Sequence, residues 1–116
     1  MRSLPRPQRI GQAGEERAAS WYRARGFRIV DRNWQTPGGE IDLVCASGPL
    51  LVFCEVKTRL SAGCGTPAEA VTGAKARRVR RAAARWLVAH RGFYPDVRFD
   101  VACITPGQVQ VIEGAF

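Results

Sequence analysis

Residues 40–57 read EIDLVCASGPLLVFCEVK, a segment in which two apolar runs are separated by a turn. The runs at residues 40–46 and 51–57 are rich in Val, Leu, Ile and Phe, as β-strands commonly are. Between them lie Ser47, Gly48 and Pro49, and these residue types dominate tight turns. The segment therefore predicts two antiparallel strands joined as a hairpin.

The charged residues of this hairpin fall at alternate positions. Because successive side chains of a strand point to opposite faces, Glu40 and Asp42 share one face, and so do Glu55 and Lys57. If the hairpin closes symmetrically around residues 48–49, Asp42 lies opposite Glu55 and Glu40 lies opposite Lys57. A shift of one residue would put Asp42 and Glu55 on opposite faces. The simplest register gathers these three carboxylates and the lysine on one patch.

Such a patch has two interpretations, which the spacing alone favours equally. Carboxylates this close repel one another unless a cation lies between them, and Mg²⁺ or Mn²⁺ prefers oxygen ligands. A bound ion would polarise a phosphoryl oxygen and help to generate hydroxide from water, while Lys57 would position that water or stabilise the transition state. In the other interpretation, the four residues form cross-strand ion pairs on a solvated face.

Other local signals place the hairpin within a longer order of elements. The sequence predicts helices at residues 12–25 and 66–91, and further strands at 27–30, 97–104 and 108–112. Gly26 ends the first helix, and Thr66, Pro67 and Glu69 start the second as a capping box. The order αβββαββ predicts an α/β fold with a mixed β-sheet flanked by helices. We expect a single domain over residues 11–116, preceded by a loose basic arm at residues 1–10.

The charge balance indicates an anionic partner. The 116 residues include 18 Lys and Arg against 10 Asp and Glu, and all of the cations except Lys57 and Lys75 are arginine. Arginine binds phosphate with two hydrogen bonds, so a basic chain of this size favours a nucleic-acid partner over a membrane surface. The alternative is a GC-rich genome that encodes arginine wherever a solvated charge is needed.

The sequence also predicts the cellular compartment of the protein and the role of its cysteines. The chain has no apolar run near the roughly 18 residues that a spanning helix needs, and its first residues lack the apolar stretch of a signal peptide. We therefore expect a cytoplasmic protein. The four cysteines form no C-x-x-C pair, and Cys45, Cys54 and Cys103 lie in apolar runs, so we expect these three to pack as small hydrophobes.

In the first predicted helix, Glu15 shares a face with Ala18, Ala19 and Tyr22, the side expected to pack inward. An acid on that side either completes a metal site or interacts with the helix dipole near the N-terminus.

The second helix has two unlike sides. Its apolar stripe consists of Val71, Val79, Ala82, Ala83, Trp86 and Ala89, and Lys75 lies within it. The opposite side carries Arg77, Arg78, Arg80, Arg81 and Arg85. This arginine side either lies along phosphates or is simply solvated. Lys75 either extends past the core edge to solvent or reaches a scissile phosphate, and the sequence favours neither.

The whole pattern resembles known nucleases. Asp42, Glu55 and Lys57 form D-x(12)-E-x-K on consecutive strands, similar to the PD-(D/E)xK nuclease core. More closely, the chain resembles the YraN-type family of small bacterial proteins, which are predicted endonucleases related in fold to archaeal Holliday-junction resolvases. The similar segments are Gly14-Glu15, Asn33-Trp34, Gly39-Glu40-Ile41-Asp42-Leu43, Val52-Phe53-Cys54-Glu55-Val56-Lys57-Thr58-Arg59, Lys75 and Arg98-Phe99-Asp100-Val101. They span nearly the whole chain.

The resemblance implies a restriction-endonuclease-like core and assigns roles to residues. Asp42, Glu55 and the backbone carbonyl of Val56 would be metal ligands, with Glu40 as a further candidate. Lys57 takes the position of the catalytic lysine, and Glu15 matches the helical glutamate of the resolvases. The chain departs from the motif name at Ile41, which stands where the proline would precede Asp42.

Together these observations predict an endonuclease that uses Mg²⁺ or Mn²⁺ to hydrolyse phosphodiester bonds, with structured or branched DNA as the expected substrate. Resolvases act as dimers, so a homodimer is expected for a four-way junction. The competing hypotheses are an inactive nuclease-fold module that binds nucleic acid within a larger assembly, and a small basic interaction protein. The expected nucleic-acid contacts are Arg59, Lys75, Arg77, Arg78, Arg81 and Arg85.

Overall fold

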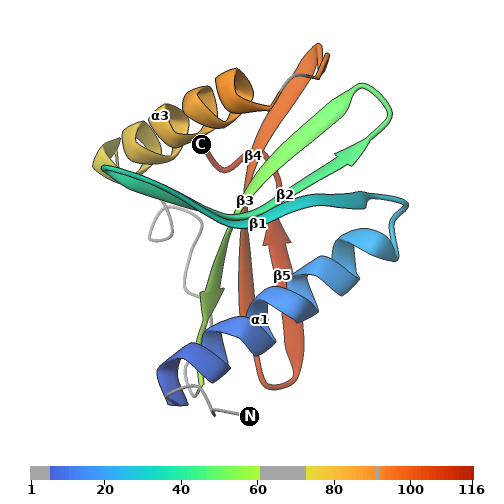
Figure 1. Ribbon diagram of the computed structural model, residues 1–116. Helices are drawn as coiled ribbons and strands as arrows, with labels where there is room; N and C mark the ends of the chain where they lie inside the picture. The colour runs from blue at the N-terminus through green and yellow to red at the C-terminus, as the bar shows by residue number, and fades with distance from the viewer. Residues whose placement is uncertain (1–5, 61–72, 91) are drawn as a thin grey trace, which may run out of the picture.

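A five-stranded mixed sheet lies between two helices in the computed structural model (Figure 1). The structure describes residues 6–60, 73–90 and 92–116. The elements are α1 (Arg6–Arg23), β1 (Arg28–Thr36), β2 (Gly39–Ser47), β3 (Leu50–Thr58), α3 (Gly73–Ala89), β4 (Asp96–Thr105) and β5 (Gln108–Ile112). Their order confirms the predicted α/β arrangement and fits a restriction-endonuclease-like fold.

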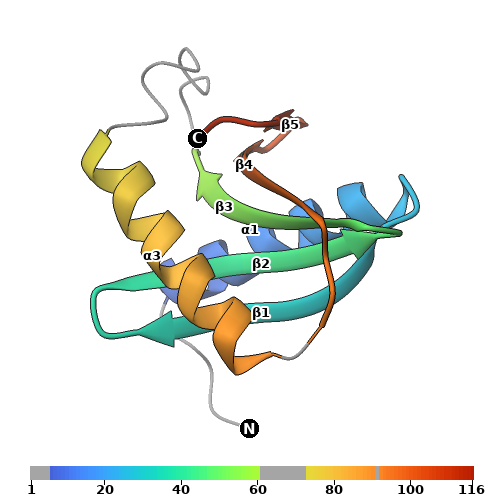
Figure 2. The same cartoon turned by 90° about the horizontal axis from the view of Figure 1, so that it is seen from above.

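The strands follow one another across the sheet in the order β1-β2-β3-β4-β5. Neighbours are antiparallel except β3 and β4, which are parallel. A parallel pair needs a crossover connection, and α3 lies within the segment that joins these two strands. Figure 2 shows α3 on one side of the sheet and α1 on the other.

Each helix buries one apolar side against the sheet and so creates a separate core. Ala18, Ala19 and Tyr22 of α1 pack with residues of β2, β3 and β4, including Leu43 and Val52. On the other face, Val79, Ala82, Ala83 and Trp86 of α3 pack with Ile41, Val44, Ala46, Leu51 and Phe53. These contacts confirm most of the two predicted apolar stripes. Ala89 is an exception, since this last residue of α3 is exposed.

Several predicted boundaries change in the structure. Helix α1 begins at Arg6, so residues 6–10 are helical and the expected arm is wrong for them. Pro7 fits this start because the first turn of a helix does not need its missing N–H. Strand β1 extends to Thr36 because it pairs with β2 as far as Gly39, although its sequence is largely polar. The expected start of the second helix, Val71 and residues 1–5 lie outside the described residues.

The cysteines follow the prediction only in part. Cys45 and Cys54 are buried free thiols, as expected. Cys103 is disulfide-bonded, which corrects the expectation that it packs as a free thiol. Spacing along the chain does not reveal such a bond, because it depends on the distance between Cα atoms in the fold. No helix in the described ranges is long and apolar enough to cross a membrane.

Asp100 links three parts of the molecule from within the core. Its carboxylate is 0% exposed and accepts hydrogen bonds from the Tyr22 hydroxyl at 2.6 Å and the Gly114 N–H at 3.0 Å. The guanidinium of Arg98 donates two more, at 2.9 and 3.0 Å. This network fastens α1 and the C-terminal segment to β4. Burial raises the pKa of Tyr22, which keeps its hydroxyl protonated as a donor.

Candidate active site

The β2–β3 hairpin closes in the predicted register and then opens. Its pairs run from Ser47↔Leu50 to Leu43↔Cys54, which confirms symmetric closure around residues 48–49. Asp42 and Glu55 are the next residues after the last of these pairs. Beyond that point β2 stays paired with β1 and β3 with β4, and in Figure 1 the β1–β2 hairpin tip extends toward α3 while β3 turns toward the start of α1. The expectation that Glu40 lies opposite Lys57 is therefore wrong.

The Asp42 side chain bridges the two strands where they separate. Its Oδ2 accepts the N–H of Val56 at 2.8 Å, so a carboxylate replaces a backbone carbonyl as the partner of this N–H. On the other side of β2, the pairs Arg32↔Leu43 and Trp34↔Ile41 place Asn33 opposite Asp42. Asn33 has φ 50, a left-handed conformation that Asn tolerates better than most residues.

This irregularity changes which side chains of β2 face α3. Ile41 and Val44 both pack in the core under α3, although a regular strand would point residues three positions apart to opposite faces. Strand alternation is therefore broken around Asp42. As a result, Ile41 stays buried while the Asp42 carboxylate reaches both Val56 and the cleft beside α3.

A cleft of about 700 Å³ opens between the β1–β2 hairpin tip, the diverging part of β3 and α3. Its lining residues are Gln35, Thr36, Gly38, Gly39, Glu40, Asp42, Glu55, Lys75, Arg78 and Val79. The hairpin tip packs directly on α3, because a Cβ added to Gly39 would lie 3.2 Å from the carbonyl oxygen of Arg78. Glycine at position 39 thus lets the hairpin form a wall of the cleft.

Burial, and then the acids around it, make Asp42 hard to ionise. Burial raises its pKa and the Val56 N–H opposes that rise, while the negative charges of Glu40, Glu15 and Glu55 add to it; the pKa reaches about 6. The fold thus brings Glu15 of α1, Glu40 of β2 and Glu55 of β3 within electrostatic range of Asp42. Sequence patterns predicted this grouping, although only the fold supplies the distances.

The carboxylate of Glu55 lies near Lys57 and Lys75, and only one of its two oxygens has a partner among the described residues. Its Oε1 forms an ion pair with the ammonium of Lys75, while its Oε2 is buried and has no hydrogen-bond partner among the described residues. Burial, then the positive charge of Lys75, lowers the pKa of Lys57, and Glu55 offsets part of this effect. Lys75 therefore faces the cleft rather than extending from the core edge into solvent.

Gly14 holds Glu15 close to the site, a role that the sequence analysis missed. Gly14 is buried, and a Cβ at this position would overlap the Thr58 hydroxyl at the end of β3. Glycine lets α1 approach β3 this closely without displacing the Thr58 hydroxyl, and the adjacent Glu15 lies within electrostatic range of Asp42. The available signal was a glycine inside a helix, because it costs about 1 kcal/mol relative to alanine and so indicates a packing requirement.

The donors in the cleft suit a hard divalent cation, although they do not form a complete cage. Among residues 6–60, 73–90 and 92–116, no group of three His, Cys, Asp or Glu residues is arranged to hold a metal ion. Mg²⁺, however, is usually bound by one or two carboxylates together with water and substrate phosphate. Asp42 and Glu55 fit this requirement, because Glu55 has an unsatisfied buried oxygen and like charges surround Asp42. Val56 joins the site through its N–H, and its carbonyl as a ligand stays a prediction.

The predicted phosphate contacts divide into two groups. Lys75 and Arg78 line the cleft. Arg59 is exposed just after β3, and its positive charge helps to lower the pKa of Lys57. Arg77, Arg81 and Arg85 are exposed on α3, whose sequence contains no acid. Arg80 differs from the others, because its guanidinium lies 4.8 Å from the centre of the Phe99 ring.

Comparison with known proteins identifies the family. The model of "Uncharacterised protein family UPF0102" matches residues 14–104, a range that includes every residue lining the cleft. A UPF0102 protein of Anaeromyxobacter dehalogenans is 49% identical over 86% of this chain and 75% of its own length. Relatives from Frankia casuarinae and Symbiobacterium thermophilum are 49% and 45% identical, over 92% and 94% of this chain and 95% and 97% of their own lengths. The chain belongs to the UPF0102 family, which confirms the resemblance to the YraN-type group.

Proposed function

We propose that this UPF0102 protein is a metal-dependent endonuclease that hydrolyses phosphodiester bonds, with structured or branched DNA as the expected substrate. One observation carries the proposal: Asp42 and Glu55 meet where β2 and β3 diverge, in a cleft that also contains Lys75 and Arg78. Carboxylates and cations gathered at a break in a sheet suit a reaction in which an anionic phosphodiester must be held and attacked, and in which further negative charge builds on its oxygens.

Asp42 and Glu55 are the residues that would hold Mg²⁺ or Mn²⁺, with Glu40 and the Val56 carbonyl as further candidate ligands. When bound, such an ion polarises a phosphoryl oxygen and lowers the pKa of a coordinated water. Its charge also relieves the repulsion that raises the pKa of Asp42. Glu15 adds a further negative charge from α1 and so favours cation binding.

Lys75 and Arg78, which line the cleft, and Lys57, which is not among its lining residues, would act on the phosphate itself. Lys57 follows Glu55 by two positions on β3, and so lies on the same face. Its ammonium would stabilise the negative charge that builds on the phosphoryl oxygens in the transition state. Lys75 and Arg78 would orient the phosphate from the α3 wall of the cleft. The ion pair between Lys75 and Glu55 holds the Lys75 ammonium beside a candidate metal ligand, which supports this role.

Charge on the rest of α3 supports a nucleic-acid substrate. Arg77, Arg81 and Arg85 are four residues apart, a spacing at which like charges destabilise a helix by roughly 0.2–0.5 kcal/mol per pair. A phosphate backbone would offset that cost, and binding would then fall as salt rises. If the substrate is a four-way junction, its two symmetric cuts call for a homodimer.

The test is cleavage of labelled DNA four-way junctions, flaps, duplexes and single strands with Mg²⁺, Mn²⁺ or EDTA. We expect the parent to cut at least one structure with a divalent metal, and Glu55→Gln to abolish cutting because it removes a metal-binding charge with little change in shape. Glu113→Gln is the matched control, because Glu113 is exposed and lies outside the cleft. Equal cleavage by the parent and Glu55→Gln would show that any activity comes from a contaminant.

A second candidate, a nuclease-fold module that binds nucleic acid without cutting it, is favoured by one feature of the cleft. Lys75 already pairs with Glu55, and the described residues contain no three-ligand group. This module would bind branched DNA but would show no Mn²⁺ binding by calorimetry and no cleavage of any structure. Absence of all nucleic-acid binding would instead favour a basic interaction protein.

A further inference from the structure

The outward side of α3 carries a stripe that the cleft does not use. Arg77, Arg81, Ala84, Arg85 and Val88 occupy positions i, i+4, i+7, i+8 and i+11, so they lie on one side of the helix. All five are exposed, and they face away from the buried residues of α3. At 1.5 Å per residue the stripe is about 16 Å long.

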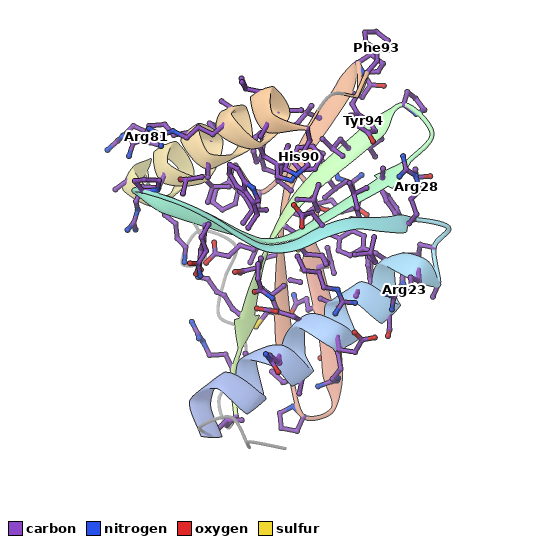
Figure 3. The ribbon with its side chains drawn as sticks, in the orientation of Figure 1. Arg23, Arg28, Arg81, His90, Phe93 and Tyr94 are labelled. Carbon is purple, nitrogen blue, oxygen red and sulfur yellow. The ribbon has the colours of Figure 1, made fainter. Side chains whose placement is uncertain are left out.

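The C-terminal half of this stripe has apolar residues beside Arg85. Val88 is 84% exposed, and a hollow of about 350 Å³ is lined by Ala84, Arg85, Val88 and Ala89. Phe93, just beyond the helix, is 89% exposed. Figure 3 shows Arg81 on the outer side of α3 and Phe93 beyond the end of the helix, near the start of β4.

The exposure of Phe93 contrasts with that of its neighbour. Tyr94 packs against the core under α3, and its hydroxyl accepts a hydrogen bond from the Arg28 guanidinium at 3.2 Å. The fold therefore uses one aromatic ring of this segment and leaves the other in water. The exposed Val88 gives the arginine stripe an apolar part, and the exposed ring of Phe93 follows beyond the end of the helix.

This combination fits a single strand of nucleic acid better than a duplex. A duplex presents phosphates outward and stacks its bases inside, so it would contact the arginines but leave Val88 and Phe93 without a partner. A single strand offers both phosphates and free base faces, and proteins that bind single strands pair a basic track with aromatic stacking. A second copy of this chain fits less well, because each copy has a net charge of +8 and the arginine stripe itself contains no acid.

We propose that the outward side of α3 binds a single-stranded segment of nucleic acid. Arg77, Arg81 and Arg85 contact its phosphates, Val88 offers an apolar contact, and a base stacks on the exposed ring of Phe93 beyond the helix end. This inference rests on the proposed function and narrows its substrate class to nucleic acids with a single-stranded branch. The N-terminal half of α3 borders the cleft through Lys75 and Arg78, so a strand lying along the helix leads from the stacking surface to the cleft.

The experiment measures the binding of a labelled oligodeoxythymidylate and a labelled blunt duplex by fluorescence anisotropy, in EDTA so that no cleavage occurs. The double variant Val88→Ser, Phe93→Ser should weaken single-strand binding by about tenfold, the scale expected for losing one stacked base, and leave duplex binding unchanged. Val97→Ser, which alters an exposed valine of β4 outside the stripe, should change neither. Because both altered residues are exposed, thermal unfolding of the double variant should match that of the parent.

Equal losses for single strand and duplex, or no loss for either, would overturn the proposal. It would also be overturned if sedimentation showed that the parent is a dimer that the double variant dissociates, because the apolar surface would then be a protein interface. These outcomes are independent of catalysis. The proposed nuclease function is tested separately, by the cleavage activity of Glu55→Gln with a divalent metal.

Discussion

Asp100 of β4 is fully buried and Asp42 of β2 is half-buried in the same sheet, yet the surroundings of these two acids are opposite. Asp100 accepts four hydrogen bonds, two of them from a guanidinium, and so its charge is matched inside the core. Asp42 accepts one hydrogen bond, from the Val56 N–H, and its electrostatic neighbours are acids. The fold has completed one carboxylate site and left the other incomplete.

The number of hydrogen bonds that an acid accepts therefore distinguishes structural acids from functional ones better than its burial does. A fully paired buried acid stabilises a fold and has no capacity left for a ligand. A buried acid whose charge is not matched by hydrogen-bond donors or cations lowers the stability of the fold, and such groups cluster at functional sites. The unpartnered oxygen of Glu55 belongs to the same incomplete region as Asp42, and Lys75 compensates only part of it.

The strongest contrast should appear in stability. Asp100→Ala should lower the free energy of unfolding by about 3–5 kcal/mol, because it leaves the Tyr22 hydroxyl and the Arg98 guanidinium without their buried partner. Urea denaturation monitored by tryptophan fluorescence measures this loss. Asp96→Ala, at an exposed position of the same strand, should change it by less than about 0.5 kcal/mol. A loss below about 1 kcal/mol for Asp100→Ala would mean that the network is not a stabilising unit.

At the cleft, the contrast should appear in rate rather than in stability. Lys57→Ala should lower single-turnover cleavage by roughly a hundredfold or more, because it removes a charge that stabilises the transition state. Affinity for DNA should barely change, since Lys57 is one cation among 18. If the variant lost stability in proportion to its loss of rate, Lys57 would be a structural residue instead.

The pH dependence of stability tests the surroundings of Asp42 without any catalysis. The pKa of Asp42 rises from 3.8 to about 6 in the folded protein. A raised pKa stabilises the fold fully below pH 3.8, and that contribution is lost as the pH increases through about 6. Asp42→Asn cannot lose it, so at pH 7 the variant should be more stable than the parent, by on the order of 2 kcal/mol.

Urea unfolding across this pH range in EDTA is the measurement, and the difference between the two proteins cancels the titration of all other groups. Parallel stability curves for parent and Asp42→Asn would mean that solvent reaches Asp42 freely. The incomplete acid would then resemble an ordinary surface carboxylate.

The smallest effect concerns the arginines outside both acid sites. Replacing Arg77 and Arg81 together with Ala should reduce the slope of log affinity against log salt by about 2, roughly one for each lost phosphate contact. Cleavage at saturating DNA should stay the same, because neither residue lines the cleft. The matched control is Arg23→Ala with Arg25→Ala on the α1 side, which should leave the salt slope unchanged. If both double variants gave the same slope of log affinity against log salt, only the net charge of the protein, and not the position of its arginines, would determine DNA binding.

Local sequence determined the strand register, the buried sides of the helices and the family of this protein. The Ser47-Gly48-Pro49 turn and the apolar runs beside it specify the register of β2 and β3, and so the approach of Asp42 to Glu55. The spacing of apolar residues specified which sides of α1 and α3 are buried. These features depend on contacts that are close in sequence or on simple periodicity, and the family followed from short motifs in the same segments.

Only the tertiary structure decided how the site is built. The divergence of the strands after Leu43↔Cys54 requires the Asp42 carboxylate to take the Val56 N–H, and neither periodicity nor composition encodes this exchange. The Lys75–Glu55 ion pair, the approach of Gly14 to Thr58 and the network around Asp100 join residues far apart in the chain. Such contacts exist only once the helices have docked on the sheet, because docking is what fixes the distances on which charge, burial and hydrogen bonding depend.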